Sequence, residues 1–207
     1  FTWNSIAKNV RMIPLKTDGL IGNSPNVKYF SEDVIIVADY HSGVFVFDGE
    51  GQGIASFDHR GMGPKQYLYV TSVNYNKQDS LILLYDGGLD KLFRFDLEGN
   101  FVDVRPANTG GVVLNIDSDG NMFSTNREGD SFVKVWDSNL RLLGEYLPFD
   151  TLYTDMQKVN HLLMSAKETG SATLRVLPVC NDTVYTITKE GANPFCIVNR
   201  GSYKCSP

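Results

Sequence analysis

Six side chains near expected turns are those best suited to bind a ligand or to carry chemistry. They are Asp39, His41, His59, Arg60, Tyr67 and Asp86. A carboxylate or imidazole can bind a metal or accept hydrogen bonds, and a guanidinium offers five donors that suit a carboxylate or phosphate. These residues form the candidate binding set. The spacing of residues identifies no catalytic group.

The aspartates have two interpretations. Asp39 and Asp86 each follow an apolar run, where a carboxylate can either hold a ligand or accept backbone N–H bonds within its own turn. The sequence favours the turn role. A second series, Asp48, Asp96 and Asp137, stands before expected hairpin turns. We predict that this second series only shapes those turns.

The link His59–Pro64 combines residues that shape a turn with residues that can bind a ligand. Gly61 and Gly63 let the backbone turn sharply, and the proline that follows restricts it. Arg60 can tie one structural module to the next through a carbonyl or carboxylate, or it can bind an anionic ligand. Tyr67 can pack in the core or offer a stacking surface. For both residues the structural role is favoured, and we predict at least two hydrogen bonds for Arg60 at the junction between modules.

No established catalytic or metal motif is present. The three histidines lack the HExxH spacing of a helix-borne metal site, and no GxSxG nucleophile motif occurs. His41 and His59 could meet within one module, but no matching carboxylate pattern accompanies them. We therefore predict no metal site and no cofactor.

Aromatic residues allow one further interpretation. The chain has 10 Tyr, 12 Phe and 2 Trp, which is also what a β-rich core uses. The core role is favoured. The alternative is a saccharide-binding face formed by Tyr29, Tyr40, Tyr67, Tyr69, Tyr75, Tyr85 and Trp136.

The elements that must position these side chains repeat along the chain. Residues 34–54 and 81–101 each contain an apolar run, an Asp, a turn with Gly, an alternating run, an aromatic-Asp pair and a second turn with Gly. Weaker copies follow at 120–143 and 182–198. Within the copies, hydrophobic residues alternate with period two, which is typical of a β-strand.

This pattern predicts an all-β protein, a β-propeller of four-stranded antiparallel blades. We expect a single domain over 1–207, and no long helix. Residues 151–165 are expected to form a loop that leads into a strand at 161–166. The expected modules are 25–58, 68–105, 111–146 and 155–200.

Composition bounds the class of protein. The chain has 207 residues, 42% hydrophobic and 21% charged, as in folded soluble domains. The net charge of -5 argues against a nucleic-acid-binding surface. The longest apolar runs, Val34–Ala38 and Leu81–Tyr85, are far shorter than the roughly 20 residues of a membrane helix. We expect no transmembrane segment. The chain has three cysteines, Cys180, Cys196 and Cys205. We expect two of them to be buried thiols and one to lie near a frayed end. The alternative is a disulfide between Cys196 and Cys205.

Several segments together resemble a known family. The stretches at 10–22, 34–39, 44–51, 59–67 and 181–207 are similar to segments of bacterial six-bladed β-propeller proteins. These proteins are abundant in Bacteroidetes and resemble NHL-repeat propellers. Their link between blades one and two has the form Arg-Gly-x-Gly-Pro-Gly-Glu-Tyr. The positions that fit are Arg60, Gly61, Gly63, Pro64 and Tyr67, while Lys65 and Gln66 depart from it.

The resemblance implies an exported bacterial protein, periplasmic or a cell-surface lipoprotein. It implies a non-catalytic binding or scaffold propeller that recognises a peptide, glycan or partner protein through its blade loops. The alternative is a metal-dependent propeller enzyme of the lactonase or lyase kind, for which calcium would be the cofactor. Six blades need roughly 300 residues at this repeat length, so the chain provides about four.

Four blades raise the question of closure. Residues 8–20, with the strand Val10–Leu15, are expected to have no partner in the first module and to act as the closing strand. Blades shaped for a six-fold ring have the wrong wedge angle for four. We therefore expect an open arc that leaves the apolar faces of the first and fourth modules exposed. Two copies of such an arc could pair as a homo-oligomer. The alternative is a closed ring in which Val10–Leu15 pairs with the last module.

Overall fold

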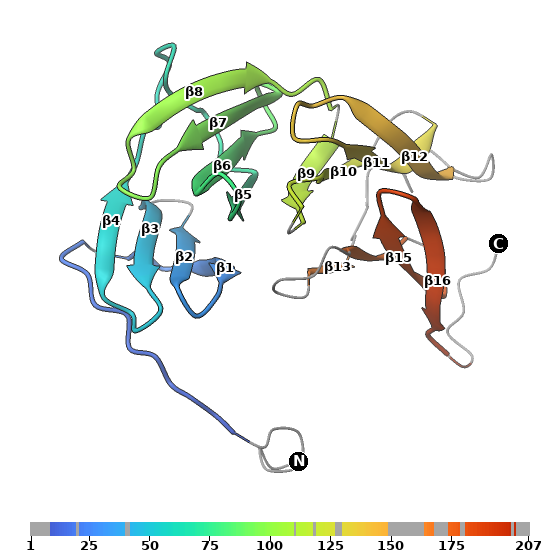
Figure 1. The fold of residues 1–207 in the computed structure, drawn as a ribbon, viewed down its shortest axis with the longest axis horizontal. Coiled ribbons are helices and arrows are strands. Elements are labelled where there is room, and N and C mark those ends of the chain that lie inside the picture. Colours follow the sequence, from blue (N-terminus) through green and yellow to red (C-terminus); the bar gives the residue numbers. More distant parts are fainter. Residues whose placement is uncertain are drawn as a thin grey trace.

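The computed structural model describes residues 9–19, 21–39, 42–109, 111–117, 119–126, 130–148, 164–167, 174–178, 181–199 and 201. Its described strands form four antiparallel sheets of four strands each, placed around a common centre (Figure 1). No α-helix occurs in these residues, and none of their elements could cross a membrane as a helix. The predicted β-propeller of four-stranded blades is confirmed.

The first two sheets follow the first two sequence repeats. The first contains β1 (Asn26–Phe30), β2 (Val34–Asp39), β3 (Gly43–Asp48) and β4 (Gly53–Phe57). The second contains β5 (Ser72–Asn76), β6 (Leu81–Asp86), β7 (Lys91–Phe95) and β8 (Phe101–Pro106). In both, each strand pairs with the next along the chain, because short turns favour antiparallel neighbours.

The other two sheets repeat this order. The third contains β9 (Gly111–Ile116), β10 (Met122–Asn126), β11 (Ser131–Trp136) and β12 (Leu142–Pro148). The fourth contains β13 (Met164–Lys167), β14 (Leu174–Leu177), β15 (Thr183–Thr188) and β16 (Gly191–Ile197). The strand expected at 161–166 is β13, and the loop expected before it lies outside the described residues. In Figure 1 the first strand of each sheet lies innermost and the fourth lies at the rim.

Period-two alternation places the two faces of each sheet against different neighbours. In β3, Val44 and Val46 join the core between the first and second sheets, while Phe45 and Phe47 face the other way. The second sheet behaves alike, because Phe93 faces the first sheet while Leu92 packs toward the third. β6 is therefore covered on both faces, as its continuous apolar run predicts.

Hairpin turns follow the predicted chemistry. Gly51 and Gly99 have φ of 84° and 83°, a conformation that a residue with a Cβ rarely adopts. The carboxylate of Asp48 accepts the N–H groups of Glu50 and Gln52 at 3.0 and 2.8 Å. Asp96 and Asp137 accept backbone N–H groups in their own turns in the same way. The turn role of this series is confirmed.

The N-terminal segment corrects the expected closing strand. Val10–Leu15 forms no strand, and the segment contacts the first sheet rather than the last. Lys16 forms a parallel bridge with Gln52 at the start of β4, and Ile13 and Ile21 pack on the outward face of the first sheet. The physical reason is local: that face is strongly apolar, and the nearest chain covers it. Its residues Ile35, Val37, Phe45 and Phe47 are consequently buried.

The sheets form an arc. Contacts link the first sheet to the second, the second to the third, and the third to the fourth. Among the described strands, those of the fourth sheet make no extensive contact with those of the first. The expected exposure of both end faces is wrong for the first sheet, which Ile13 and Ile21 cover. In the fourth sheet, Phe195 and Ile197 are exposed on the rim strand β16.

Cys196 also lies exposed on β16, so the expectation of a buried thiol is wrong there. Cys180 and Cys205, and with them the Cys196–Cys205 bridge, lie outside the described residues.

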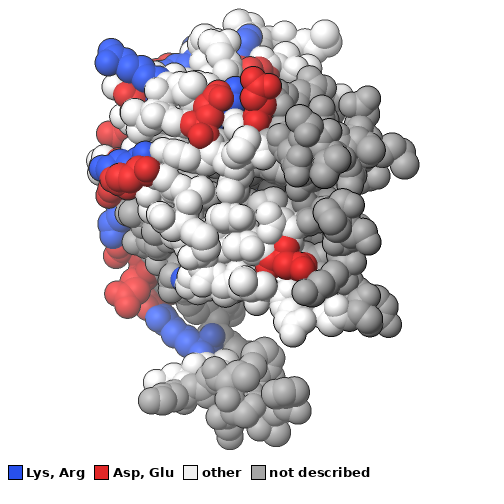
Figure 2. All heavy atoms as spheres, turned by 90° about the vertical axis from the view of Figure 1, so that its right-hand side faces the viewer, with Lys and Arg blue, Asp and Glu red and all other residues white. Residues whose placement is uncertain are grey.

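Figure 2 shows the side of the molecule that lies on the right in Figure 1. Charged side chains of both signs gather along one margin and near the top, and the middle of the face is largely uncharged. The described part of this face thus carries no broad basic patch of the kind that binds nucleic acid.

Candidate functional site

Asp86 and Asp39 occupy equivalent places at the ends of β6 and β2. Asp86 is fully buried and accepts the N–H groups of Gly88 and Leu89 in its own turn at 2.9 and 3.0 Å. Its second oxygen accepts the N–H groups of Leu68 and Tyr69, at 2.6 and 3.1 Å, from the link between the first and second sheets. The carboxylate therefore joins that link to the β6–β7 turn.

Asp39 repeats this arrangement in the first sheet. Its carboxylate oxygens accept the N–H groups of Ser42 in the following turn and Ser24 in the preceding segment, at 2.9 and 3.0 Å. Asp39 is 2% exposed. The turn role favoured by the sequence is thus confirmed for both residues. The structure adds that each carboxylate also holds the incoming segment, which spacing alone does not reveal.

The link between the first two sheets is organised around one carboxylate. Asp58 Oδ1 accepts the backbone N–H of Arg60 at 3.1 Å and the guanidinium Nε–H at 2.8 Å, and Oδ2 receives the remaining arm of the guanidinium. The Tyr67 hydroxyl donates to Asp58 Oδ1 at 3.3 Å. Arg60 therefore makes the predicted bonds at the predicted junction, and the carboxylate that it holds is two residues away in the same link.

Burial and charge set the titration of this link. The Arg60 guanidinium, by hydrogen bonding and by its charge, holds the pKa of Asp58 below its usual range. Burial raises the pKa of Tyr67 well above that of a free phenol. Tyr67 is completely buried and packs edge-on against Phe93 and Phe95. It is a packing residue, so the interpretation as a stacking surface for a ligand is wrong.

His59 packs in the same region. Its ring contacts those of Phe57 and Phe95, with centroid distances of 5.6 and 5.2 Å, and Nε2 lies 3.2 Å from the carbonyl oxygen of Gly99. His41 lies outside the described residues, so its expected proximity to His59 stays a prediction. Within the described part of the chain, no three His, Cys, Asp or Glu side chains stand close enough to hold a metal ion.

The aromatic face expected as a saccharide-binding alternative does not form. Tyr75, Tyr85 and Trp136 are buried, as is Tyr67, and they belong to the cores between sheets. Tyr69 is 54% exposed, and Tyr40 lies outside the described residues. The aromatic residues serve the sheet-to-sheet packing, as the favoured interpretation holds.

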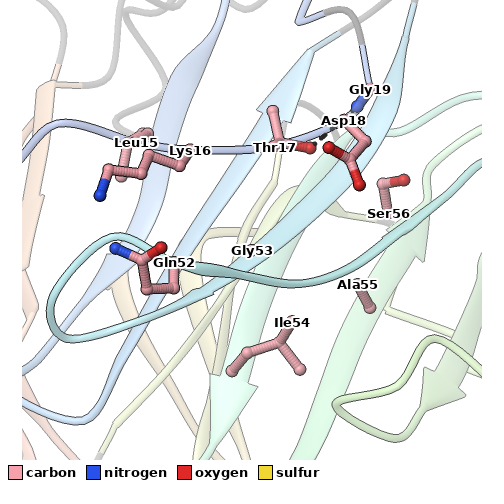
Figure 3. A pocket seen from close by; sticks show the side chains of 10 residues that line it. All are labelled: Leu15, Lys16, Thr17, Asp18, Gly19, Gln52, Gly53, Ile54, Ala55 and Ser56. Carbon is pink, nitrogen blue, oxygen red and sulfur yellow. Dashed lines mark hydrogen bonds between the residues drawn. The ribbon is translucent and has the colours of Figure 1, made fainter.

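A cleft of about 660 Å³ lies elsewhere, between the N-terminal segment and β4 (Figure 3). Lys16 is bonded to the edge of the first sheet, since its N–H donates to the Gly51 carbonyl and its carbonyl accepts the Gly53 N–H, both at 2.8 Å. The chain then leaves the edge, and the Gly19 N–H donates to Thr17 Oγ1 at 3.1 Å. The divergence of residues 17–19 from β4 opens the cleft.

Most groups around this cleft are polar but not reactive. Lys16, Thr17 and Asp18 line one side, and Gln52 and Ser56 line the other. Leu15, Ile54 and Ala55 add apolar surface. None of the described residues that line the cleft is a His, Cys, Glu or aromatic residue. The cleft can therefore bind by hydrogen bonds, two opposite charges and modest apolar contact.

None of the five predicted residues that the structure describes lines this cleft, and His41 lies outside the described residues. His59, Arg60 and Tyr67 share one link, and Asp39 and Asp86 serve two equivalent turns. The cleft residues were missed because their sequence, Leu15–Gly19, carries no motif. The one available signal is the polar run Lys16–Asp18 directly after apolar residues, which marks where a covering segment leaves an apolar face.

Comparison with known families gives one match over the whole chain. The family described as a domain of unknown function, DUF4934, matches residues 1–207. No curated protein matches the sequence.

Solved structures share the fold at low identity. A predicted exported protein of Bacteroides fragilis aligns with a TM-score of 0.71 and 17% identity, over 90% of this chain and 54% of its own length. A DUF4221-family member from Bacteroides vulgatus gives 0.58 and 10%, over 93% and 63% of the two chains. A streptogramin B lyase gives 0.55 and 14%, over 87% and 56%. The chain thus spans between half and two thirds of the length of these structures, and the likeness shows the fold alone.

Proposed function

The chain belongs to the DUF4934 family, and we propose that it is a non-catalytic binding or scaffold propeller that holds a peptide, glycan or partner protein. The binding site is the cleft between residues 15–19 and β4. The observation that carries this proposal is the cleft itself. Its volume of about 660 Å³ is typical of small-ligand sites, which span about 300–1,000 Å³. Its described lining offers hydrogen-bonding groups, among them Lys16, Gln52 and Ser56.

This site differs from the blade-loop site that the sequence suggests. The candidate residues Asp39, Asp86, Arg60 and Tyr67 are occupied by bonds within the protein, whereas Lys16, Asp18 and Ser56 face the cleft. Charged and polar groups that face an open cleft are available to a ligand. This difference favours the cleft over the loops.

Export is part of the same proposal. We propose that the protein acts in the periplasm or at the cell surface, anchored as a lipoprotein, and that its blades correspond to part of a six-bladed, NHL-like pattern. The resemblance of the link at 59–67 supports this, as does the similarity in fold to a predicted exported protein. Fractionation of the native host, with detection by antibody, tests the location. Recovery of the protein in the cytoplasm would contradict it.

Thermal unfolding with ligand panels tests the cleft. Pools of random blocked peptides and of oligosaccharides are added to the protein and to a variant whose cleft is filled, Ser56→Trp. A ligand at 100 times its dissociation constant stabilises the fold by roughly 2.7 kcal/mol. We expect a shift for the unmodified protein and for the control Asn139→Trp, which adds the same side chain in an exposed turn. The same shift in Ser56→Trp would place the ligand elsewhere.

A further inference from the structure

We infer that the ligand of this cleft is an extended peptide that adds its main chain to the edge of β4, an inference that rests on the proposed function. An exposed strand edge presents unpaired N–H and C=O groups, and an extended chain that pairs with them gains main-chain hydrogen bonds. The edge of β4 that faces away from β3 has this character.

The edge already accepts one extended residue. β4 is the outermost strand of its sheet, and among the described residues its outer side is paired only at the bridge of Lys16 with Gln52. Both hydrogen bonds of that bridge are 2.8 Å long, so the geometry suits a parallel strand. Beyond Gly53, the strand continues to Phe57 without a further bridge from this segment.

The chain leaves the edge instead of continuing along it. After Thr17 the segment passes onto the sheet face, where a Cβ added to Gly19 would lie 3.3 Å from Phe45 Cε1 and 3.6 Å from Ser56 Oγ. Among the described residues, Ile54–Phe57 thus have no partner on their outer edge, and the cleft lies beside it. A strand rises about 3.3 Å per residue, so this edge matches about four residues of an extended peptide.

The lining favours a peptide over a saccharide. A sugar ring gains from an aromatic side chain on which to stack, and none of the described residues that line the cleft is aromatic. A peptide instead needs backbone partners, and the exposed strand provides them. Alternate side chains of the peptide would meet Ile54 and Ser56, which are both exposed on the same face of β4.

Opposite charges give the ligand a direction. Figure 3 shows the Lys16 ammonium at the end of the cleft near Gln52, and the Asp18 carboxylate at the other end near Ser56. Because complementary charges select orientation, the peptide carries an acidic side chain toward Lys16 and a basic one toward Asp18.

A phage-displayed library of random heptapeptides tests this inference. The library is selected on the full protein without counter-selection, and the binding of the enriched peptide to Ser56→Trp is measured afterwards. The enriched sequence is synthesised with blocked ends, and its dissociation constant is measured by calorimetry. Single N-methylation at each amide removes one donor and leaves the side chains. We expect roughly tenfold weaker binding for alternate amides only, because a strand points every second amide toward its partner.

Two further measurements keep the test independent of the tryptophan variant. The Asp18→Lys change is at an exposed position, and it should weaken binding of the selected peptide by roughly fivefold. Binding to this variant should recover when the basic residue of the peptide is replaced by an acidic one. Hydrogen exchange of those amides of Ile54–Phe57 that point away from β3 should slow in the complex, and that of the β8 edge should not.

The outcomes separate the two proposals. If every N-methylated peptide binds as well as the parent, or if only oligosaccharides bind in the cleft, the peptide inference is overturned while the cleft remains a binding site. If the selected peptide binds Ser56→Trp and Asp18→Lys unchanged, the cleft itself is not the site and both proposals fail. If neither panel binds at millimolar concentration, both also fail.

Discussion

At the scale of single residues, the charged side chains inside this fold are used to hold backbone segments. Asp86 illustrates the principle, since one buried carboxylate accepts N–H groups from two stretches of chain that are far apart in sequence. A buried charge is tolerated only when such bonds replace its hydration. Asp58 is exposed rather than buried, and the guanidinium of Arg60 provides its counter-charge.

Replacing Asp86 with Ala should destabilise the protein more than any change in the exposed turn series. The loss leaves N–H groups of four residues without their acceptor, and unsatisfied buried groups cost about 1–3 kcal/mol each before relaxation. We expect a loss of about 3 kcal/mol in urea unfolding. Asp48→Ala is the matched control, with an expected loss of about 1 kcal/mol because water can replace its bonds. Equal losses would refute this role of Asp86.

The Asp58–Arg60 pair should make stability depend on pH in the acid range. Since the folded pKa of Asp58 lies below the unfolded value of about 3.9, the pair stabilises the fold above that pH. Its contribution is lost as the pH falls through the lower folded pKa. We expect Asp58→Asn to flatten the fall in stability below about pH 4, as measured by unfolding at several pH values. Arg60→Lys, which loses the fork geometry, should cost about 0.5–1 kcal/mol at neutral pH. An unchanged pH profile in Asp58→Asn would contradict the assignment.

At the scale of elements, tight turns determine how each hairpin meets its neighbour. Gly99 in the β7–β8 turn lies against the Phe57 ring at the end of β4, and its carbonyl lies 3.2 Å from His59 Nε2. Gly51 in the β3–β4 turn lies against Ile13 and Pro14 of the N-terminal segment. Each of these turns therefore closes its own hairpin and also packs against a segment from another part of the chain.

Gly99→Val should destabilise the fold for both reasons. A β-branched residue at a φ of 83° costs about 1–2 kcal/mol, and its Cβ would collide with the Phe57 ring in addition. We expect a loss of at least about 2 kcal/mol in thermal or urea unfolding. Gly191→Val is the control, because a Cβ there meets nothing within 4 Å and φ is not positive. A melting temperature of Gly99→Val equal to that of the control would show that the repeat alignment is wrong at this turn.

At the scale of the whole molecule, the N-terminal segment covers one end of the arc. It lies on the outward face of the first sheet at β2 and β3, and it leaves β4 beside the cleft. The chain that precedes β1 is long enough to reach that face, which explains this covering.

Charges introduced under the covering segment should uncover the first sheet. In Ile13→Asp/Ile21→Asp, two apolar side chains that pack on Phe45 and its neighbours become hydrated carboxylates. We expect a loss of about 2–3 kcal/mol and concentration-dependent self-association in sedimentation velocity. Val10→Asp is the control, since Val10 is 67% exposed and should tolerate the charge. If the double variant remains as stable and as monodisperse as this control, the segment does not protect the face.

Much of the fold follows from local sequence. Alternation in 44–48 and 91–95, the Gly and Asp residues of the turns and the repeat near 47 residues predicted the strands, the hairpins and the blade architecture. These features are local because a strand and its hairpin partner are neighbours along the chain. The roles of Asp39, Asp86 and Tyr67 as structural residues were also favoured on these grounds.

The sequence by itself determined that this chain forms β-blades closed by glycine turns, because those patterns depend on neighbours within a few residues. Only the tertiary structure decided where Lys16 and Ile13 go, since the covering of an apolar face depends on which surface a distant segment reaches first. The cleft arises from that placement. Thr17 and Asp18 belong to no sequence motif, and they face Ser56 only because the chain bends away from β4 after a single pairing residue.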